Sequence, residues 1–125
     1  MSKYNNKKVV VDGMEFDSKK EANYYLYLKQ KEGNGEISGL QMQVPFEIIP
    51  AVYGKRLVHL KTKTKEVEYC IQRATHYVAD FVYVITATGQ KEVVDVKSEI
   101  TRKNAEYRLK KKMMLAFNGI SIVEV

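Results

Sequence analysis

The sequence predicts an α/β fold in which a central mixed β-sheet is flanked by helices. Three observations support this prediction. A helix-start signal near residue 18 precedes several strand-like segments. Two apolar runs, 76–85 and 92–97, are separated by a short polar turn, and a helical pattern over 102–117 leads into a last apolar segment at 120–125. A helix followed by a terminal strand is typical of a sheet with parallel as well as antiparallel neighbours.

The N-terminal segment is predicted to hold an arm and a hairpin. Residues 1–8 are polar and basic and predict a flexible basic arm, which leaves residues 9–125 as a single domain. The dipeptide Asp12-Gly13 stands between the short apolar segments 9–11 and 14–16. That dipeptide is typical of the tight turn in a β-hairpin, so we expect one here.

A first helix is predicted over residues 19–31. Ser18 is a favourable N-cap, and Glu21 follows it at the spacing of a capping box. Gly33 predicts the end of the helix. Its buried stripe is expected to consist of Ala22, Tyr25, Leu26 and Leu28.

The middle of the chain predicts extended structure. Residues 37–50 form an apolar segment that Pro45 interrupts, which favours an edge strand or a bent strand. Residues 53–65 are basic and alternate in polarity, which indicates a strand or a projecting hairpin arm. Residues 66–74 have no assignment, and the two apolar runs that follow them are predicted to form a β-hairpin.

The C-terminal part predicts a helix and a strand. Ser98 or Thr101 is the expected cap of a helix over 102–117, and Asn118-Gly119 is the expected stop. The apolar stripe of this helix is expected to consist of Ala105, Leu109, Met113 and Phe117. Residues 120–125 predict a final strand.

Composition narrows the possible functions. The net charge of +6 favours a polyanionic partner such as nucleic acid, although the same charge can serve solubility alone. The single cysteine, Cys70, excludes an internal disulfide and a cysteine-based zinc site, and two histidines make a histidine-rich site a poor expectation. Any metal is therefore expected to be Mg²⁺ or Mn²⁺ held by carboxylates. No apolar stretch is long enough for a membrane span and the start lacks a signal-peptide core, so we expect a cytoplasmic protein.

Asp80, Asp95 and Lys97 are the candidate catalytic residues. They interrupt the two apolar runs of the predicted hairpin, where isolated charges are costly unless they are paired, solvated or bound to metal. Asp95 and Lys97 point to the same face of a strand because side chains alternate. The alternatives are a simple surface ion pair for these two residues, and a strand end or a pair with a lysine for Asp80. Glu21 is a further candidate, since it borders the packed face of its helix, but it also suits a capping box alone.

These residues resemble the motif of the PD-(D/E)xK nuclease superfamily. Asp80 matches its first aspartate, although Ala79 replaces the usual proline, and Asp95-Val96-Lys97 matches (D/E)xK. Glu21 matches the acidic residue often supplied by the first helix. The segments 12–22 and 77–81 further resemble small phage-encoded proteins of that superfamily, some of whose members are Holliday-junction resolvases that act as homodimers.

The resemblance implies a restriction-endonuclease-like core, with the order helix, three-strand meander, helix and strand. It implies a Mg²⁺- or Mn²⁺-dependent DNA endonuclease that resolves branched DNA in the host cytoplasm. Glu21, Asp80, Asp95 and the carbonyl of Val96 would hold the metal. Lys97 would act on the attacking water or stabilise the developing negative charge. A general or nicking endonuclease and a non-catalytic DNA-binding or phage assembly protein remain alternatives.

Basic side chains are the candidates for contact with the DNA backbone. They occur in the predicted arm at 53–65 and in the predicted helix at 102–117. The alternative is that these basic side chains only form a solvated charged surface. The candidate residues are Lys55, Arg56, Lys61, Lys63, Arg102, Lys103, Arg108 and Lys111.

Overall fold

The computed structural model describes residues 8–125. The proposed flexible arm therefore lies outside the described residues, except for Lys8, whose ammonium is 3.2 Å from the Glu15 carboxylate. The elements follow the order β1 (Val9–Val11), β2 (Met14–Phe16), α1 (Lys19–Gly33), β3 (Ile37–Ile49), β4 (Val52–His59), β5 (Thr64–Gln72), β6 (Thr75–Ile85), β7 (Lys91–Asp95), α2 (Glu99–Arg102), α3 (Ala105–Asn118) and β8 (Val123–Glu124).

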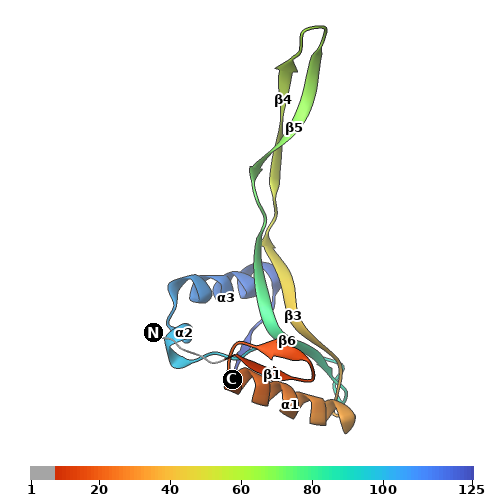
Figure 1. The fold of residues 1–125 in the computed structure, drawn as a ribbon, viewed down its shortest axis with the longest axis vertical. Coiled ribbons are helices and arrows are strands. Elements are labelled where there is room, and N and C mark those ends of the chain that lie inside the picture. Colours follow the sequence, from red (N-terminus) through yellow and green to blue (C-terminus); the bar gives the residue numbers. More distant parts are fainter. Residues whose placement is uncertain (1–7) are drawn as a thin grey trace.

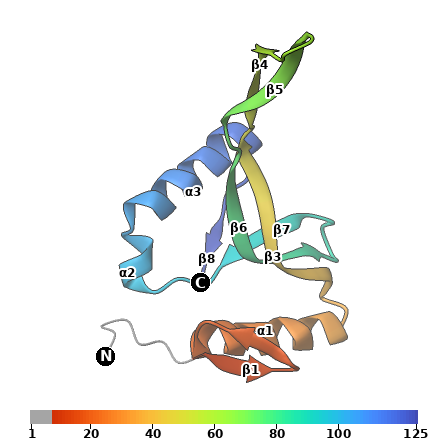
Figure 2. The same ribbon diagram turned by 45° about the horizontal axis from the view of Figure 1, so that its top comes forward.

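A four-stranded mixed sheet forms the centre of the fold, as predicted. Its strand order is β3-β6-β7-β8, with antiparallel pairing except between β7 and β8, which are parallel. Helix α1 lies on one side of this sheet and α3 on the other (Figures 1 and 2). No helix in residues 8–125 is long and apolar enough to cross a membrane.

Helix α1 begins and ends close to its predicted bounds. The Ser18 hydroxyl accepts a hydrogen bond of 3.1 Å from the Glu21 amide, so the predicted cap is confirmed. Ala22, Tyr25 and Leu28 are buried, but Leu26 is exposed, so its place in the predicted stripe is wrong. The buried residues follow an i, i+3, i+6 row, and Leu26 lies to one side of it.

Two apolar clusters fill the two faces of the sheet. The first joins α1 and the β1–β2 hairpin to the sheet through residues such as Phe16, Leu28 and Phe81. The second joins α3 to the other face through residues such as Tyr77 and Met114. The sheet is thus covered on both sides, and polar side chains at its centre lie between two cores.

The predicted helix over 102–117 is wrong at its start. Ser98 caps the short helix α2, which ends at Arg102, and Asn104 caps the separate helix α3. The Asn104 side chain accepts a hydrogen bond of 3.0 Å from the Tyr107 amide. An asparagine competes for backbone donors in this way and therefore starts a new helix. The helix stop is confirmed, because Gly119 takes the left-handed conformation with φ 67°.

The predicted apolar stripe of this helix faces mostly outward, and of its four residues only Met113 is partly buried against the second cluster. Leu109 and Phe117 are 57% and 62% exposed, whereas Tyr107 and Met114 pack on the sheet. Tyr107 can be buried because its hydroxyl donates a hydrogen bond of 2.8 Å to Glu124. The helix therefore has two partly apolar faces, and its periodicity could not show which one meets the sheet.

Strands β4 and β5 form the projecting arm that the basic segment predicted. They pair only with each other, and neither contains a buried residue. Figure 1 shows this ribbon extending away from the rest of the molecule. The unassigned residues 66–74 mainly form its return strand.

Two strand predictions need correction. Strand β3 is an edge strand, as expected, but it runs through Pro45, which pairs with Val78. Its irregularities fall instead between Ser38 and Gln41 and between Glu47 and Ile49. An edge strand has a free side on which the missing proline N–H costs no ladder bond. The final strand is shorter than expected and spans only Val123–Glu124.

Candidate active site

Asp80 and Asp95 face each other across two neighbouring strands. Phe81 pairs with Val94 in the antiparallel register of β6 and β7, which places Asp80 of β6 opposite Asp95 at the end of β7. Asp95 is fully buried and Asp80 is half-buried. The predicted hairpin thus brings two carboxylates together at the centre of the sheet.

Asp95 has an unusual environment for a charged group. The Tyr77 hydroxyl donates a hydrogen bond to its Oδ2 atom. Its Oδ1 atom lies 3.3 Å from the Lys97 ammonium, yet it accepts no hydrogen bond from the described residues, so this contact is ionic only. Burial, together with the neighbouring Asp80 carboxylate, raises the pKa of Asp95 to about 7.

Asp80 is held from two sides. Its Oδ2 atom accepts a hydrogen bond of 2.9 Å from the Val96 amide, and its Oδ1 atom accepts one of 3.3 Å from the Gln43 side chain. The amide contact anchors Asp80 to the segment that follows β7. Val96 also lines a cavity of about 260 Å³ together with Glu21, Asp80 and Lys97.

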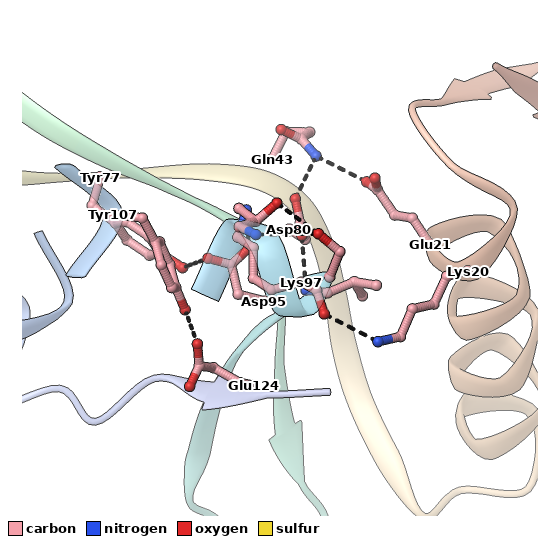
Figure 3. A network of polar contacts seen from close by, with 12 residues as sticks. Lys20, Glu21, Gln43, Tyr77, Asp80, Asp95, Lys97, Tyr107 and Glu124 are labelled. Carbon is pink, nitrogen blue, oxygen red and sulfur yellow. Dashed lines mark hydrogen bonds and ion pairs between the residues drawn. The ribbon is translucent and has the colours of Figure 1, made fainter. Parts of the chain in front are cut away.

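Glu21 reaches the same region from α1. Its carboxylate is buried and its Oε1 atom accepts a hydrogen bond of 3.3 Å from Gln43, which also contacts Asp80 (Figure 3). Burial, followed by the charge of Asp80, raises the pKa of Glu21 to about 7. The backbone N–H of Glu21 donates to the Ser18 cap, while its side chain accepts from Gln43 and faces the sheet. The cap therefore does not use the carboxylate, whose role as a metal ligand stays a prediction.

The Lys97 side chain lines two cavities. It lines the cavity described above and a second one of about 400 Å³ that contains Asp95, Tyr77 and Tyr107. Its ammonium lies 5.2 Å from the centre of the Tyr107 ring. The Lys20 ammonium donates a hydrogen bond of 3.1 Å to the Lys97 carbonyl, which ties α1 to the segment after β7.

The chemistry of the donors in this region is the kind that a hard divalent cation prefers. Burial, together with the charge of Asp80, raises the pKa of both Glu21 and Asp95, and Asp95 Oδ1 is buried without a hydrogen bond from the described residues. Oxygen donors of this kind suit Mg²⁺ or Mn²⁺. In the conformation described for residues 8–125, however, no three His, Cys, Asp or Glu side chains form a ready metal cluster. The Gln43 amide stands between Glu21 and Asp80 instead (Figure 3).

Sequence reasoning missed several residues of this region. Gln43, Lys20, Tyr77 and Tyr107 contact the carboxylates or Lys97. The two tyrosines belong to a chain rich in tyrosine, and only the fold brings them to the site. Gln43 shares its polar character with many surface residues, so no local pattern distinguishes it.

Seven of the eight basic candidates separate into two groups, and Lys103 belongs to neither. Arg102, Arg108 and Lys111 line one cavity of about 380 Å³, together with Lys112, which sequence reasoning omitted. Lys111 also contacts Glu124 at 2.7 Å. The second group, Lys55, Arg56, Lys61 and Lys63, lies on or at the tip of the projecting ribbon, and Lys103 lies 4.0 Å from Glu99 on the surface.

The raised pKa values predict that metal-free protein loses stability as the pH rises from about 4.5 to about 7.5. The unfolded chain releases the protons of Glu21 and Asp95 near their ordinary pKa values of 4.5 and 3.8, whereas the folded chain retains them until about pH 7. Across this interval the unfolded state binds fewer protons, so rising pH favours unfolding. Below it both states are protonated, and the effect vanishes.

The Glu21→Gln variant isolates one of these two groups. Its neutral amide mimics the protonated acid, so in chelator at pH 8 we expect it to be more stable than the wild type by on the order of 2 kcal/mol. At pH 4.5 that advantage should nearly disappear. Thermal or denaturant unfolding at both pH values measures the difference, and an equal difference at both would contradict the assignment.

Comparison with known proteins identifies one matching protein family. A family model described as "Protein of unknown function (DUF1064)" matches residues 1–122. No curated protein and no solved structure matches the chain. The arrangement of residues in the site is therefore the main guide to what the chain does.

Proposed function

We propose that this chain, which belongs to the DUF1064 family, is a metal-dependent endonuclease that hydrolyses phosphodiester bonds in DNA. The observation that carries the proposal is the pair of opposed carboxylates, Asp80 and Asp95, with the Lys97 ammonium 3.3 Å from one of them. Asp95 is a buried carboxylate with a raised pKa, beside the Lys97 ammonium and a cavity, and such groups are typical of catalytic sites.

The proposal includes a restriction-endonuclease-like core. The order of the elements along the chain supports such a core. Helix α1 comes first, the antiparallel strands β3, β6 and β7 follow, and helix α3 and the parallel strand β8 come last. The β4–β5 ribbon would then be an insertion between the first and second strands of the meander. Residues 9–125 would form one nuclease domain.

Glu21, Asp80, Asp95 and the carbonyl of Val96 would hold Mg²⁺ or Mn²⁺. When bound, the cation would supply a bound water of lowered pKa and would stabilise negative charge on the phosphate. The carboxylates must lose their protons to bind it, and the Val96 amide and Gln43 keep Asp80 directed into the site. Lys97 would orient the attacking water or donate to a phosphate oxygen, since it lines both cavities at the site.

Two basic surfaces would hold the DNA backbone. The cavity with Arg102, Arg108, Lys111 and Lys112 lies beside Tyr107, whose ring contacts Lys97. Over residues 52–72, the ribbon has five basic and two acidic side chains. A two-stranded ribbon is narrow enough for the major groove, and this one projects roughly 25 Å if each residue of β4 adds about 3.3 Å.

Charge removal on the ribbon tests its contact with DNA. We expect the double variant Lys61→Ala and Lys63→Ala to weaken binding of duplex DNA and to lower the salt dependence of binding by about two counterions. Fluorescence anisotropy at several salt concentrations measures both quantities. Lys29→Ala, on α1 at the far end of the molecule from the ribbon tip, is the control (Figure 1). An unchanged salt dependence in the double variant would remove the ribbon from the DNA interface.

We further propose that the substrate is branched DNA and that the enzyme acts as a homodimer. A coordinated cut in two strands needs two sites, and a two-fold dimer matches the symmetry of a four-way junction. The exposed apolar stripe with Leu109 and Phe117 on α3 provides surface for a second copy. The residues described form one candidate site per chain.

The substrate comparison is the central experiment for this function. We expect the protein to cleave a four-way junction at least about tenfold faster than a linear duplex of the same sequences, a difference of about 1.4 kcal/mol in the barrier. Light scattering should give the mass of a dimer. Equal cleavage of both substrates, or a strict monomer, would leave a general or nicking endonuclease. Tight binding without cleavage would instead favour a non-catalytic DNA-binding or assembly protein.

A further inference from the structure

Gln43 occupies a strained position in the middle of strand β3. Its neighbours Met42 and Val44 pair with Phe81 and Ala79, so Gln43 lies opposite Asp80. Its φ angle is 52°, in the left-handed region that residues other than glycine rarely adopt. Strain of this kind persists only where the surrounding structure enforces it, and it is concentrated at functional sites.

The strained backbone delivers one amide group to two carboxylates. Gln43 Nε2 lies 3.3 Å from Glu21 Oε1 and 3.3 Å from Asp80 Oδ1, and Figure 3 shows it between the two. A primary amide has two N–H donors, so one nitrogen can donate to both acceptors. It offsets part of the repulsion between two acidic groups that come from different elements, α1 and β6.

The surroundings leave the amide room to move. Gln43 lines a cavity of about 550 Å³ with Glu21, Phe16 and Met42. The side chain is therefore open to one side, while its backbone is held in the paired strand. It can keep the two carboxylates in place when no cation is present and give way when one arrives.

We propose that Gln43 is a positioning residue of the cation site, which holds Glu21 and Asp80 in place until a divalent cation binds. The proposal rests on the proposed function only in its assignment of the two carboxylates as ligands. Groups that orient metal ligands through hydrogen bonds commonly alter metal affinity by about 10- to 100-fold when they are removed. The alternative is that Gln43 merely joins α1 to the sheet.

Substitution by glycine separates these two roles. Gln43→Gly removes the amide but suits a positive φ angle, so the backbone strain is relieved. We expect its Mn²⁺ affinity to fall by about 10-fold or more, while its melting temperature in chelator stays within a few degrees of the wild type. A residue that merely joins α1 to the sheet would lower the melting temperature and leave Mn²⁺ affinity unchanged in the folded variant.

Two further variants complete the experiment. Asparagine tolerates the left-handed conformation, but its shorter side chain cannot span both carboxylates. We therefore expect Gln43→Asn to lose Mn²⁺ affinity as Gln43→Gly does. This variant also provides the test if the glycine variant folds poorly. Gln41→Ala, at an exposed glutamine of the same strand, is the matched control and should bind Mn²⁺ as the wild type does. Electron paramagnetic resonance of free Mn²⁺ during a titration measures affinity without any DNA.

The outcomes distinguish this inference from the nuclease proposal. Wild-type Mn²⁺ affinity in both Gln43→Gly and Gln43→Asn would overturn the role of Gln43 and leave the nuclease proposal intact. Mn²⁺ binding that depends on Gln43, without cleavage of any DNA, would support this inference and remove the nuclease activity. A wild-type protein that binds no Mn²⁺ would overturn both.

Discussion

Asp95→Asn is expected to abolish DNA cleavage, with a loss of at least about 10³-fold, as is common when one member of a catalytic group is removed. Asp95 is the most buried of the candidate carboxylates, and its Oδ1 atom is free of hydrogen bonds from the described residues. Asparagine keeps the shape of the side chain but removes the charge that would attract a cation. Single-turnover cleavage with saturating protein measures the effect.

Measurements of folding and of DNA binding are the controls for the Asp95→Asn variant. The loss of a buried charge should leave the melting temperature in chelator equal to or above that of the wild type, because burial disfavours the charged form of Asp95. DNA binding should be retained, since it depends on basic groups elsewhere. Glu36→Gln, at an exposed acidic residue, is the matched variant and should cleave normally. Near-normal cleavage by Asp95→Asn would place the active site elsewhere.

The site should also behave as one unit. Asp80→Asn and Lys97→Ala are each expected to cause a loss similar to that of Asp95→Asn, and the double variants should lose little more than the single ones. The reason is geometric, since Asp80 lies opposite Asp95 and the Lys97 ammonium is 3.3 Å from the latter. Additive losses would indicate that these residues act independently.

Removal of divalent cations is expected to have the second large effect. Cleavage should stop in chelator and return with Mg²⁺ or Mn²⁺, because the candidate ligands are carboxylates without a thiol or imidazole cluster in residues 8–125. Ca²⁺ should support DNA binding with little cleavage. At pH 8, Mn²⁺ should also raise the melting temperature, since a ligand of the folded state stabilises it.

A measurement of secondary structure in chelator is the control for cation removal. Circular dichroism in chelator should match that of the loaded protein, because two apolar clusters hold the sheet between its helices. Undiminished cleavage in chelator, by protein free of contaminating nucleases, would contradict the proposed metal chemistry.

Local patterns in the sequence were sufficient for much of the fold. The Ser18 cap, the Asp12-Gly13 turn and the Gly119 stop depend on a few neighbouring residues, and the structure confirms each of them. The pairing of β6 and β7, which brings Asp80 and Asp95 together, also follows from neighbouring segments and a short turn. Local interactions of this kind can be predicted from the sequence because backbone propensity and side-chain alternation determine them.

Tertiary packing decided the rest. The outward stripe of α3 could not be predicted because both Leu109 and Met114 belong to apolar rows, and only the partner surface selects one of them. Gln43 is 22 residues from Glu21 and 37 from Asp80, so its bridging role exists only once β3 has paired with β6 and α1 has packed beside them. The sequence by itself thus determined most of the elements, the acidic pair on adjacent strands and Glu21 as a further candidate. The contact of Glu21 with the site, the amide between the acids and the raised pKa values depend on burial and on contacts between distant segments, which arise only when the whole chain is folded.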